Sequence, residues 1–513
     1  MATNAAELDR LLDGLETAML EGDQTSVAAL TERLWAHRRQ LPAILVERLI
    51  GGRARIPALA FELLGGFAGP TAGERALRRV AAAAAAPDIV RWGARRRVGW
   101  PQRGEAKARL EFLLSLKDAD ATLVEAVIQA GWVWPPDVEV LEEVLAYLVV
   151  LPAERRRAVV QRAVDEAEPG PALPWLLRAL VHLPDSVLVR LAVSELVRLR
   201  DHAAVGALRR LIQTTRDADI RAEAEAAERR LRLQIVDRSR PTSEEEPVPW
   251  LPLDGVHLSA VDGAGAQVLL LLRRWEAGTR LVADVLQTDT WGIKDAFGRY
   301  RSPAGELAEL TVESFRAGGV DLVEIDLPSA RGALAAAIAT NAATGRPLPP
   351  AFELWEPFFH EAFPPASDEP TTVPELDDAP FASRADLVRR SAALLEHPFF
   401  QSWFFNPDEI GPALEELVLG RGARLREVQY GPVIGRLVDT PLREQLRRRL
   451  RRQAWLLDRY GGQRERDLAL ATAASLDRAT AAGLAKHPFL RGMVDASLDN
   501  LLQSLAFDAL RAT

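Results

Sequence analysis

The run Asp185-Ser186-Val187-Leu188-Val189-Arg190-Leu191-Ala192 has the features of a helix start, with an acidic cap followed by apolar residues at helical spacing. A turn follows near Asp201, and the residues from Ala204 to Thr214 predict a second helix. The opening returns as Asp219-Ile220-Arg221-Ala222, so the apolar-Arg pair recurs after 31 residues. That period corresponds to one helical hairpin, which cannot bury its apolar faces without stacking on a neighbour.

A less regular copy of this opening occurs earlier, as Pro87-Asp88-Ile89-Val90-Arg91-Trp92-Gly93-Ala94, after a helical stretch that contains Ala76 to Ala86. These openings resemble those of short HEAT-type repeats in phycobilisome-lyase-like proteins, where an acidic cap, an apolar-Arg pair and small residues recur at each helix start. The resemblance covers residues 185–232 and extends over residues 42–184. It implies an α-solenoid whose concave face binds a partner, usually a protein. A non-repetitive helical bundle also fits the helix pattern.

Two acidic stretches that contain proline, residues 237–249 and 364–380, separate segments of different pattern. Neither composition suits a packed core, so both are predicted to be linkers. We therefore expect a HEAT-like helical repeat domain at 1–236, a small α+β domain at 250–363 and a helical domain at 381–513. The predicted fold class is mostly α, with an N-terminal α-solenoid, an α+β middle domain and a C-terminal helical region.

The middle segment changes from helical to strand patterns. Two apolar runs, Gln267–Trp275 and Thr279–Val285, flank a short Glu-Ala-Gly turn and predict a β-hairpin. Residues 256–261 predict a further strand, and a short strand is expected at 320–325. A helix is predicted from about Pro328 to just before Gly345.

The run 289–298, Asp-Thr-Trp-Gly-Ile-Lys-Asp-Ala-Phe-Gly, is a candidate polar site on a loop that leaves a strand. Its candidate residues are Asp289, Trp291, Lys294 and Asp295. If the middle domain is an enzyme, these charged groups and Asp284 are its expected site. We favour a strand exit in which Trp291 and Phe297 are buried and the charges face solvent. The C-terminal half resembles bacterial proteins of unassigned function, so this likeness implies a domain family and no activity.

A basic amphipathic helix is predicted from Pro441 to Tyr460, with leucines on one stripe and arginines on the other faces. The candidate basic face consists of Arg443, Arg447, Arg448, Arg451 and Arg452. Such a face suits nucleic-acid phosphates, anionic lipid or an acidic partner. We favour a solvated face paired with acidic residues of this half, and the acidic linkers are candidate partners.

A His-Pro-Phe triplet occurs twice, at 397–399 and 487–489. We interpret each as a helix-ending turn, in which Pro stops the helix and Phe anchors the exit. The alternative brings the two histidines together as metal ligands or proton carriers. The aromatic residues of 399–405 exceed what one helix face requires, and some of them are candidates to dock on another domain.

Motifs for common chemistries are absent from the sequence. Because the chain contains no cysteine, disulfides, thiolate zinc sites and cysteine nucleophiles are excluded. None of the four lysines follows a glycine, which excludes a standard P-loop, and the glycines of 262–266 predict a hairpin turn. The seven histidines lack ligand spacing, so we expect no metal and no other cofactor.

The 64 basic and 72 acidic residues give a formal charge of -8, which does not suit a polycation that coats nucleic acid. The sequence shows no signal peptide and no apolar run long enough to cross a membrane, so we expect a soluble cytoplasmic protein. The favoured function is a non-enzymatic scaffold that binds a protein partner through its α-solenoid surface. The alternatives are a nucleic-acid-associated protein that uses the 441–459 helix and an enzyme with its site in the middle domain.

Overall fold

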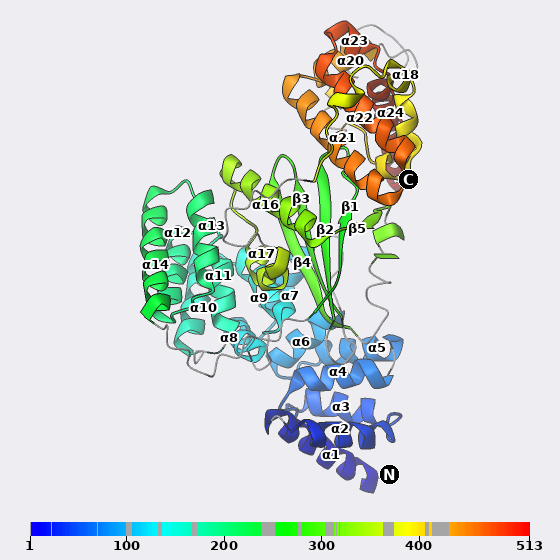
Figure 1. Cartoon of the computed structure of the whole chain (residues 1–513). Coiled ribbons are helices and arrows are strands. Elements are labelled where there is room, and N and C mark those ends of the chain that lie inside the picture. The colour runs from blue at the N-terminus through cyan, green and yellow to red at the C-terminus, as the bar shows by residue number, and fades with distance from the viewer. Residues whose placement is uncertain are drawn as a thin grey trace. The chain divides into compact units, whose positions relative to one another are not determined.

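The computed structural model describes residues 2–21, 23–68, 70–98, 105–131, 136–166, 170, 172–237, 252–274, 280–302, 312–313, 315–317, 319–362, 374–405, 410–412 and 430–512. The chain forms two compact units, Met1–Leu177 and Arg178–Thr513, whose elements are labelled in Figure 1. As predicted, the fold is mostly α, with a five-stranded antiparallel sheet in the middle region.

The first unit is built from helices. Its helices are α1 (Ala2–Glu21), α2 (Gln24–Trp35), α3 (Leu41–Ile50), α4 (Pro57–Ala68), α5 (Pro70–Ala82), α6 (Asp88–Val98), α7 (Glu105–Leu114), α8 (Ala119–Ala130), α9 (Val138–Val150) and α10 (Ala153–Glu166). The next helix, α11 (Ala172–Leu180), contains the boundary between the units. Aspartates set several of the starts: Asp118 accepts the N–H of Ala121 at 2.9 Å, and Asp137 accepts the N–H of Val140 at 3.1 Å.

Helices of the first unit pack mainly on helices one or two places away in the chain. Helix α3 contacts α4 and α5, α4 contacts α5 and α6, and α8 contacts α6, α9 and α10. These helices thus contact the next helix in the chain and the one after it, which is compatible with an α-solenoid. Leu45, Leu64, Leu123 and Leu141 are among the fully buried side chains that fill these contacts.

The acid and arginine of one repeat opening hold the start of a later helix. The Asp88 carboxylate accepts the backbone N–H groups of Lys117 and Asp118 at 2.7 and 3.0 Å. The Arg91 guanidinium donates to the carbonyl of Ser115 at 3.5 Å. Because Asp118 itself caps α8, these bonds link the start of α6 to the start of α8.

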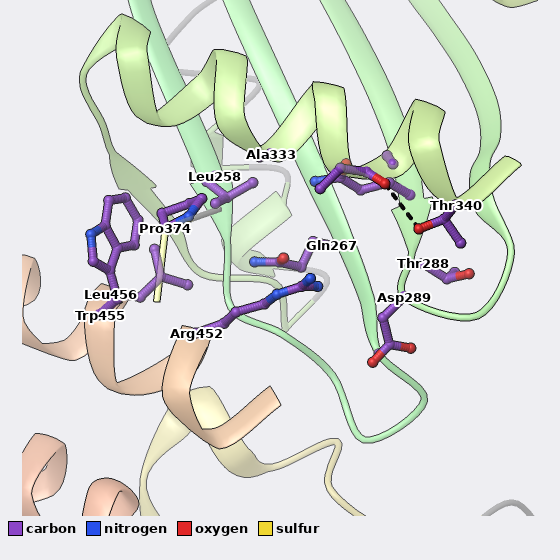
Figure 2. A pocket seen from close by; sticks show the side chains of 14 residues that line it. Leu258, Gln267, Thr288, Asp289, Ala333, Thr340, Pro374, Arg452, Trp455 and Leu456 are labelled. Atoms are coloured by element: carbon purple, nitrogen blue, oxygen red, sulfur yellow. Dashed lines mark hydrogen bonds between the residues drawn. The ribbon is translucent and has the colours of Figure 1, made fainter. Parts of the chain in front are cut away.

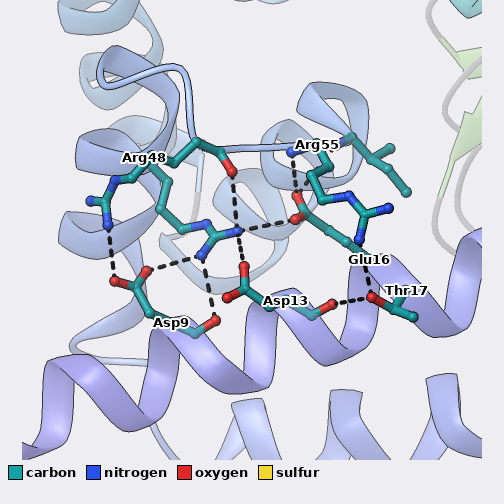
Figure 3. Close-up of polar contacts among 8 residues, drawn as sticks. Asp9, Asp13, Glu16, Thr17, Arg48 and Arg55 are labelled. Carbon is teal, nitrogen blue, oxygen red and sulfur yellow. Dashed lines mark hydrogen bonds and ion pairs between the residues drawn. The ribbon is translucent and has the colours of Figure 1, made fainter.

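A buried arginine ties α3 to α1 in the first unit. Arg48 is only 3% exposed, and its guanidinium binds three carboxylates (Figure 3): Asp9 at 3.1 Å, Asp13 at 2.7 Å and Glu16 at 3.0 Å. Glu16 also accepts the backbone N–H of Arg55 at 3.0 Å. Burial lowers the pKa of Arg48, but the bonds to Asp13 and Asp9 more than offset this and leave its pKa raised. The arginine therefore stays charged inside the helical stack.

The second unit begins with the helices that carry the 31-residue period: α12 (Ser186–Arg198), α13 (Ala204–Thr214) and α14 (Ala218–Asp237). Asp185 is the expected cap, since it accepts the N–H of Leu188 at 3.2 Å. Helix α13 has the predicted bounds. At α14 the capping acid is Asp217, which accepts the N–H groups of Asp219 and Ile220 at 2.9 and 3.1 Å.

The sheet has the strand order β4-β3-β2-β1-β5. Its strands are β1 (Leu253–Ser259), β2 (Ala266–Arg274), β3 (Arg280–Thr288), β4 (Gly292–Ser302) and β5 (Leu322–Glu324). The predicted hairpin is formed by β2 and β3, the two further predicted strands are β1 and β5, and the glycines of 262–266 form the β1–β2 turn.

Strand β4 was not predicted from the sequence. Residues 289–291 form the β3–β4 turn, and β4 starts at Gly292, so Lys294 and Asp295 lie in an edge strand and not on a loop. The expected burial of Trp291 and Phe297 is wrong, because these side chains are 45% and 37% exposed. An edge strand needs few apolar residues, which explains why its sequence is weakly hydrophobic.

Helix α16 (Leu327–Thr344) covers part of one face of the sheet (Figure 1) and is followed by α17 (Pro350–Trp355) and the 3-10 helix η1 (Glu356–Ala362). It ends at Gly345, as predicted, where φ is +63°. The buried Asn341 accepts the N–H of Ile293 at 2.6 Å and donates to its carbonyl at 3.2 Å. This close approach needs Gly292, which has φ +87° and no side chain to meet Asn341.

A buried ion-pair network binds the α12–α13 hairpin to α17. Arg210 donates to both carboxylate oxygens of Glu353 at 2.8 and 2.6 Å, and His182 Nε2 lies 2.8 Å from the same carboxylate. Arg216 also donates to the carbonyl of Thr344 at 2.7 Å. Residues 178–237 therefore belong to the same compact unit as the sheet. The linker expected at 237–249 lies outside the described residues except at its first position.

The last part of the second unit is helical. Its elements are η2 (Ala379–Phe381), α18 (Ala385–Val388), η3 (Ser391–Glu396), η4 (Pro398–Phe400), α20 (Tyr430–Leu437), α21 (Thr440–Tyr460), α22 (Gln463–Arg478), α23 (Ala481–Ala485) and α24 (Pro488–Ala512). In both His-Pro-Phe triplets a helix ends before the histidine, the next begins at the proline, and the phenylalanine is buried. Each triplet thus lies at a helix end with a buried phenylalanine, as interpreted, but its proline begins the next helix and does not stop the preceding one.

Part of the aromatic cluster docks on the β1–β2 turn. The Trp403 indole is fully buried and donates to the carbonyl of Val261 at 2.7 Å. Gln453 of α21 accepts the N–H of Val261 at 2.8 Å. Gly263 lies so close to this segment that a Cβ would stand 2.6 Å from the carbonyl oxygen of Ser402. The sheet and the C-terminal helices are thus packed together at this turn.

None of the helices within the described ranges combines the length and apolar character that crossing a bilayer requires.

Candidate functional site

Two arginines of the predicted basic face bind the acidic stretch 364–380. Arg447 donates to both carboxylate oxygens of Asp378 at 2.7 and 3.0 Å. Arg451 donates to the carbonyl of Leu376 at 2.8 Å. The part of this stretch that the structure describes, from Pro374 onward, is therefore an internal partner of α21. These two guanidinium groups are already occupied.

The other arginines of the face have different surroundings. Arg443 donates to the carbonyl of Ala479 at 3.2 Å, and Arg448 bonds to Glu444 of the same helix at 3.2 Å. Arg448 is the most exposed of the paired arginines on α21, with 62% of its side chain accessible. The fifth residue, Arg452, points toward the sheet and is considered below.

The predicted polar loop is not assembled as one site. Asp289 in the β3–β4 turn is bound by Arg449 of α21, with contacts of 2.7 and 2.9 Å. Trp291, Lys294 and Asp295 are exposed, and Arg346 lies over the Trp291 ring at 3.8 Å from its centroid. Asp284 lies in β3, and its side chain is outside the described part of the structure. These groups do not form a common pocket, because Asp289 alone among them lines the cavity described next.

A polar cavity lies between the sheet, α16 and α21 (Figure 2). It encloses about 440 Å³ between atoms of β1, β2, β3, the two helices and Pro374, and part of this space is open to solvent. Leu258, Ala333 and Leu456 supply apolar wall. The residues with polar side-chain groups at its lining are Gln267, Gln287, Thr288, Asp289, Thr340, Arg452 and Trp455.

Two glutamines form the sheet side of this cavity. Gln267 on β2 and Gln287 on β3 are direct partners in the register, so their side chains share one face, and both are 6% exposed. Gln267 donates to the carbonyl of Ser259 at 3.0 Å. Among the described residues, the Oε1 of Gln287 has no hydrogen-bond partner. A buried amide oxygen without a partner is costly, so this atom marks a position where a donor would be stabilising.

Arg452 supplies the cation of the cavity. Figure 2 shows its side chain leaving α21 and extending toward Asp289 and Gln267. Its Nε is buried and has no hydrogen-bond partner within the described part of the chain. Burial lowers the pKa of Arg452, although Asp289 and Glu375 act in the opposite direction. An arginine remains protonated in such surroundings, so the cavity holds a permanent positive charge.

Sequence reasoning placed Arg452 on a surface and missed the two glutamines. A signal was present, because the predicted hairpin turns at Ala277 and positions 267 and 287 are equally far from it. Two glutamines at paired positions in strongly apolar strands are unusual. The approach of α16 and α21 to that face depends on contacts between distant segments, for which the sequence has no local pattern.

The first unit contains a groove between α4, α6, α8 and α9. It measures about 420 Å³, a volume that includes open solvent, and the buried side chains of Phe61, Ile89 and Trp92 line it. Its polar lining is formed by Arg96, Arg97, Gln129 and Asp137. Because these helices belong to successive pairs of the stack, the groove runs across repeat units and not within one.

Arg96 is held only loosely at this groove. Its guanidinium nitrogens lie 3.7 Å from Asp137 and 3.6 Å from Glu139, which is ion-pair distance but too long for hydrogen bonds. Its Nε has no hydrogen-bond partner among the residues that the structure describes. The groove therefore combines aromatic surface with an incompletely bonded cation.

Within the described ranges, no cluster of three or more His, Asp or Glu side chains is arranged to hold a metal ion. Comparison with known proteins finds no family model, no curated protein and no solved structure that matches this chain.

Proposed function

We propose that this protein is a non-enzymatic interaction protein of the cytoplasm that binds a protein partner through the HEAT-like helical stack of its first unit. The observation that carries the proposal is the groove across α4, α6, α8 and α9. Repeat proteins of this kind use surfaces that cross several repeats to bind extended partners.

The groove favours a partner segment with an apolar side chain next to a carboxylate. Phe61 and Trp92, which are 4% and 3% exposed, form an apolar floor against which the apolar group would rest. Arg96 offers a guanidinium whose terminal nitrogens make only long ion pairs, so a partner's carboxylate would gain a charge-assisted hydrogen bond there. Its long contacts with Asp137 and Glu139 can be exchanged for such a bond at little cost.

The two alternative functions have weaker support. The nucleic-acid alternative needs free arginines on the 441–459 helix, and Arg447 and Arg451 are bonded to Asp378 and Leu376. The enzyme alternative needs the charged residues of the middle region in one pocket, and of these Lys294 and Asp295 are exposed on an edge strand.

The test is capture from lysate of the native host with the intact chain, at low and high salt, followed by mass spectrometry and nucleic-acid detection. A photo-crosslinking residue at Gln129 should form a covalent bond with the same protein that is captured. Gln129→Trp should abolish capture, because it fills the groove. Gln161→Trp is the matched control, since both glutamines donate to a carboxylate four residues away on an exposed helix face.

Capture that is equal for the Gln129→Trp and Gln161→Trp variants would rule out the groove as the binding surface. Recovery of nucleic acid alone, lost at high salt, would support the basic-helix alternative instead.

A further inference from the structure

We propose that the cavity between β1–β3, α16 and α21 is a binding site for a small monocarboxylate that carries a hydroxyl group. In this site the carboxylate binds Arg452, and the hydroxyl group donates to the Oε1 of Gln287. The inference concerns the second unit and does not depend on the proposed function of the first.

The charge balance of the cavity favours one negative charge. Asp289 lines the cavity, but both of its carboxylate oxygens are bound by Arg449 at 2.7 and 2.9 Å. The Asp289–Arg449 pair is neutral overall. The guanidinium of Arg452 therefore gives the cavity a net charge of +1. A monoanion neutralises it, whereas a dianion such as phosphate would place excess charge beside Asp289.

Hydrogen-bonding capacity defines the second feature of the ligand. The Oε1 of Gln287 is a buried acceptor without a partner, and the Nε of Arg452 is a buried donor without a partner. Other polar groups of the lining have internal partners: Gln267 donates to the carbonyl of Ser259, Thr340 donates to the carbonyl of Ala336, and Thr288 accepts the N–H of Trp291. A ligand must therefore bring an acceptor for Arg452 and a donor for Gln287, and a hydroxy acid brings both.

The walls limit the size of the ligand. Leu258, Ala333 and Leu456 leave apolar contact for a short carbon chain. The 440 Å³ includes open solvent, and only about 20 Å³ of it can hold the centre of a water molecule, so the site suits a molecule of a few heavy atoms and not a nucleotide.

The proposal also predicts how Arg452 affects the stability of the empty protein. A partly buried guanidinium with an unpaired N–H destabilises the empty protein. Removing the charge by Arg452→Gln should therefore leave the thermal stability of the empty protein unchanged or higher. An arginine with a purely structural role would show the opposite result.

The experiment is calorimetric titration of the full chain with four probes: glycolate, L-lactate, acetate and inorganic phosphate. Glycolate and L-lactate should bind saturably. Acetate should bind at least threefold more weakly than glycolate, because it has no donor for Gln287. Arg452→Gln should weaken glycolate binding at least tenfold, and Arg448→Gln on the exposed face of the same helix should leave it unchanged.

Two further variants keep the test decisive. If Arg452→Gln does not fold, Arg452→Lys retains the charge without the planar fork and should weaken glycolate binding severalfold. Gln287→Met should retain acetate binding while removing the preference for glycolate over acetate. The proposal is overturned if none of the three carboxylates binds, if phosphate binds and they do not, or if Arg452→Gln binds glycolate as tightly as the wild type.

Discussion

Arg449 binds both carboxylate oxygens of Asp289, with Nε to Oδ2 at 2.7 Å and Nη2 to Oδ1 at 2.9 Å, across 160 residues of sequence. Both side chains are more than nine-tenths buried. Arg449 also donates to the carbonyl of Gly263 in the β1–β2 turn. One guanidinium of α21 thus holds two turns at the same end of the sheet.

Removing one partner of this pair should be strongly destabilising. Arg449→Met leaves a buried carboxylate without its cation, and we expect the free energy of unfolding to fall by about 3–5 kcal/mol. Arg448→Met, one residue earlier and exposed, should cost less than about 1 kcal/mol. Denaturant unfolding of both variants measures the difference. If the double variant Arg449→Met/Asp289→Leu is no more stable than Arg449→Met alone, the pair is not the cause of the loss.

The Glu353 network should make the second unit sensitive to acid. Burial raises the pKa of Glu353, but Arg210 and His182 lower it by more, so its pKa lies well below the usual range. Its stabilising contribution is complete above the unfolded pKa, about 4.5, and is lost as the pH falls further. Thermal unfolding of the wild type from pH 6 to pH 2 should show this loss.

Glu353→Gln should remove that contribution at neutral pH, because Arg210 then stays buried without an anion. The expected loss is about 3–5 kcal/mol. Glu223→Gln, which breaks an exposed pair with Arg190, is the control and should cost less than about 1 kcal/mol. If both variants lose the same free energy of unfolding, the buried Glu353 network contributes no more to stability than an exposed ion pair.

His487 should add an acid-sensitive contribution in a higher pH range. Burial lowers the pKa of His487 to about 4, from 6.5 in the unfolded chain. The folded imidazole is therefore neutral where the unfolded one is protonated, and stability falls as the pH drops from about 6.5 to about 4. At pH 5 this amounts to about 2 kcal/mol relative to pH 8.

His487→Gln retains a polar partner for Ser475, which lies 2.7 Å from the His487 Nε2. We expect this variant to lose the slope between pH 6.5 and pH 4 while keeping the steeper loss below it. Unfolding curves at half-unit pH intervals test this. An unchanged slope in the variant would mean that His487 does not titrate in this way.

Gly292 should tolerate no side chain. A Cβ at this position would lie 2.2 Å from the Asn341 Oδ1 and 2.5 Å from the carbonyl oxygen of Ala337, at φ +87°. Gly292→Ala should therefore cost about 3 kcal/mol or more, from backbone strain and overpacking together. Gly319→Ala separates the two effects, since φ is +80° there and nothing lies within 4 Å of the added atom. We expect about 1 kcal/mol at that position, and a similar loss at both would contradict the packing argument.

The Arg48 cluster should determine how firmly α1 is attached to the first unit. Arg48→Met leaves the buried Glu16 without its cation, and we expect a loss of about 3–5 kcal/mol. Hydrogen exchange of α1 amides measures the effect locally. Arg78→Met, at an exposed pair with Glu74, should leave exchange in α1 as it is in the wild type.

Local sequence patterns predicted much of the fold. Apolar runs predicted β2 and β3. The Asp185 cap and the helical spacing of apolar residues predicted α12 and α13, and Gly345 predicted the end of α16. Strand β4 was not predicted, because an edge strand beside solvent carries charged residues. Its sequence, GIKDAFGRYRS, shows no clear alternation of apolar and polar residues. Local chemistry was thus sufficient wherever one face of an element was buried.

The candidate sites were less predictable, because they depend on pairs of residues that are far apart in the chain. Asp289 and Arg452 were singled out separately, as a loop acid and a surface cation, and the cavity that both line was not foreseen. The sequence predicted that the basic helix could pair with an acidic stretch, but it did not predict that Arg447 would bind Asp378. Composition indicates that acidic and basic residues will form ion pairs. Which residues pair with each other is decided by the packing of distant segments.

The neighbour-to-neighbour contacts of the first unit have a mechanical consequence. Helices such as α3 and α8 contact only nearby helices substantially, so no strong cross-link joins distant repeats within the described part of this unit. Small rotations at successive interfaces can then add up without any interface being broken. The stack should behave as an elastic element whose compliance grows with the number of stacked helices.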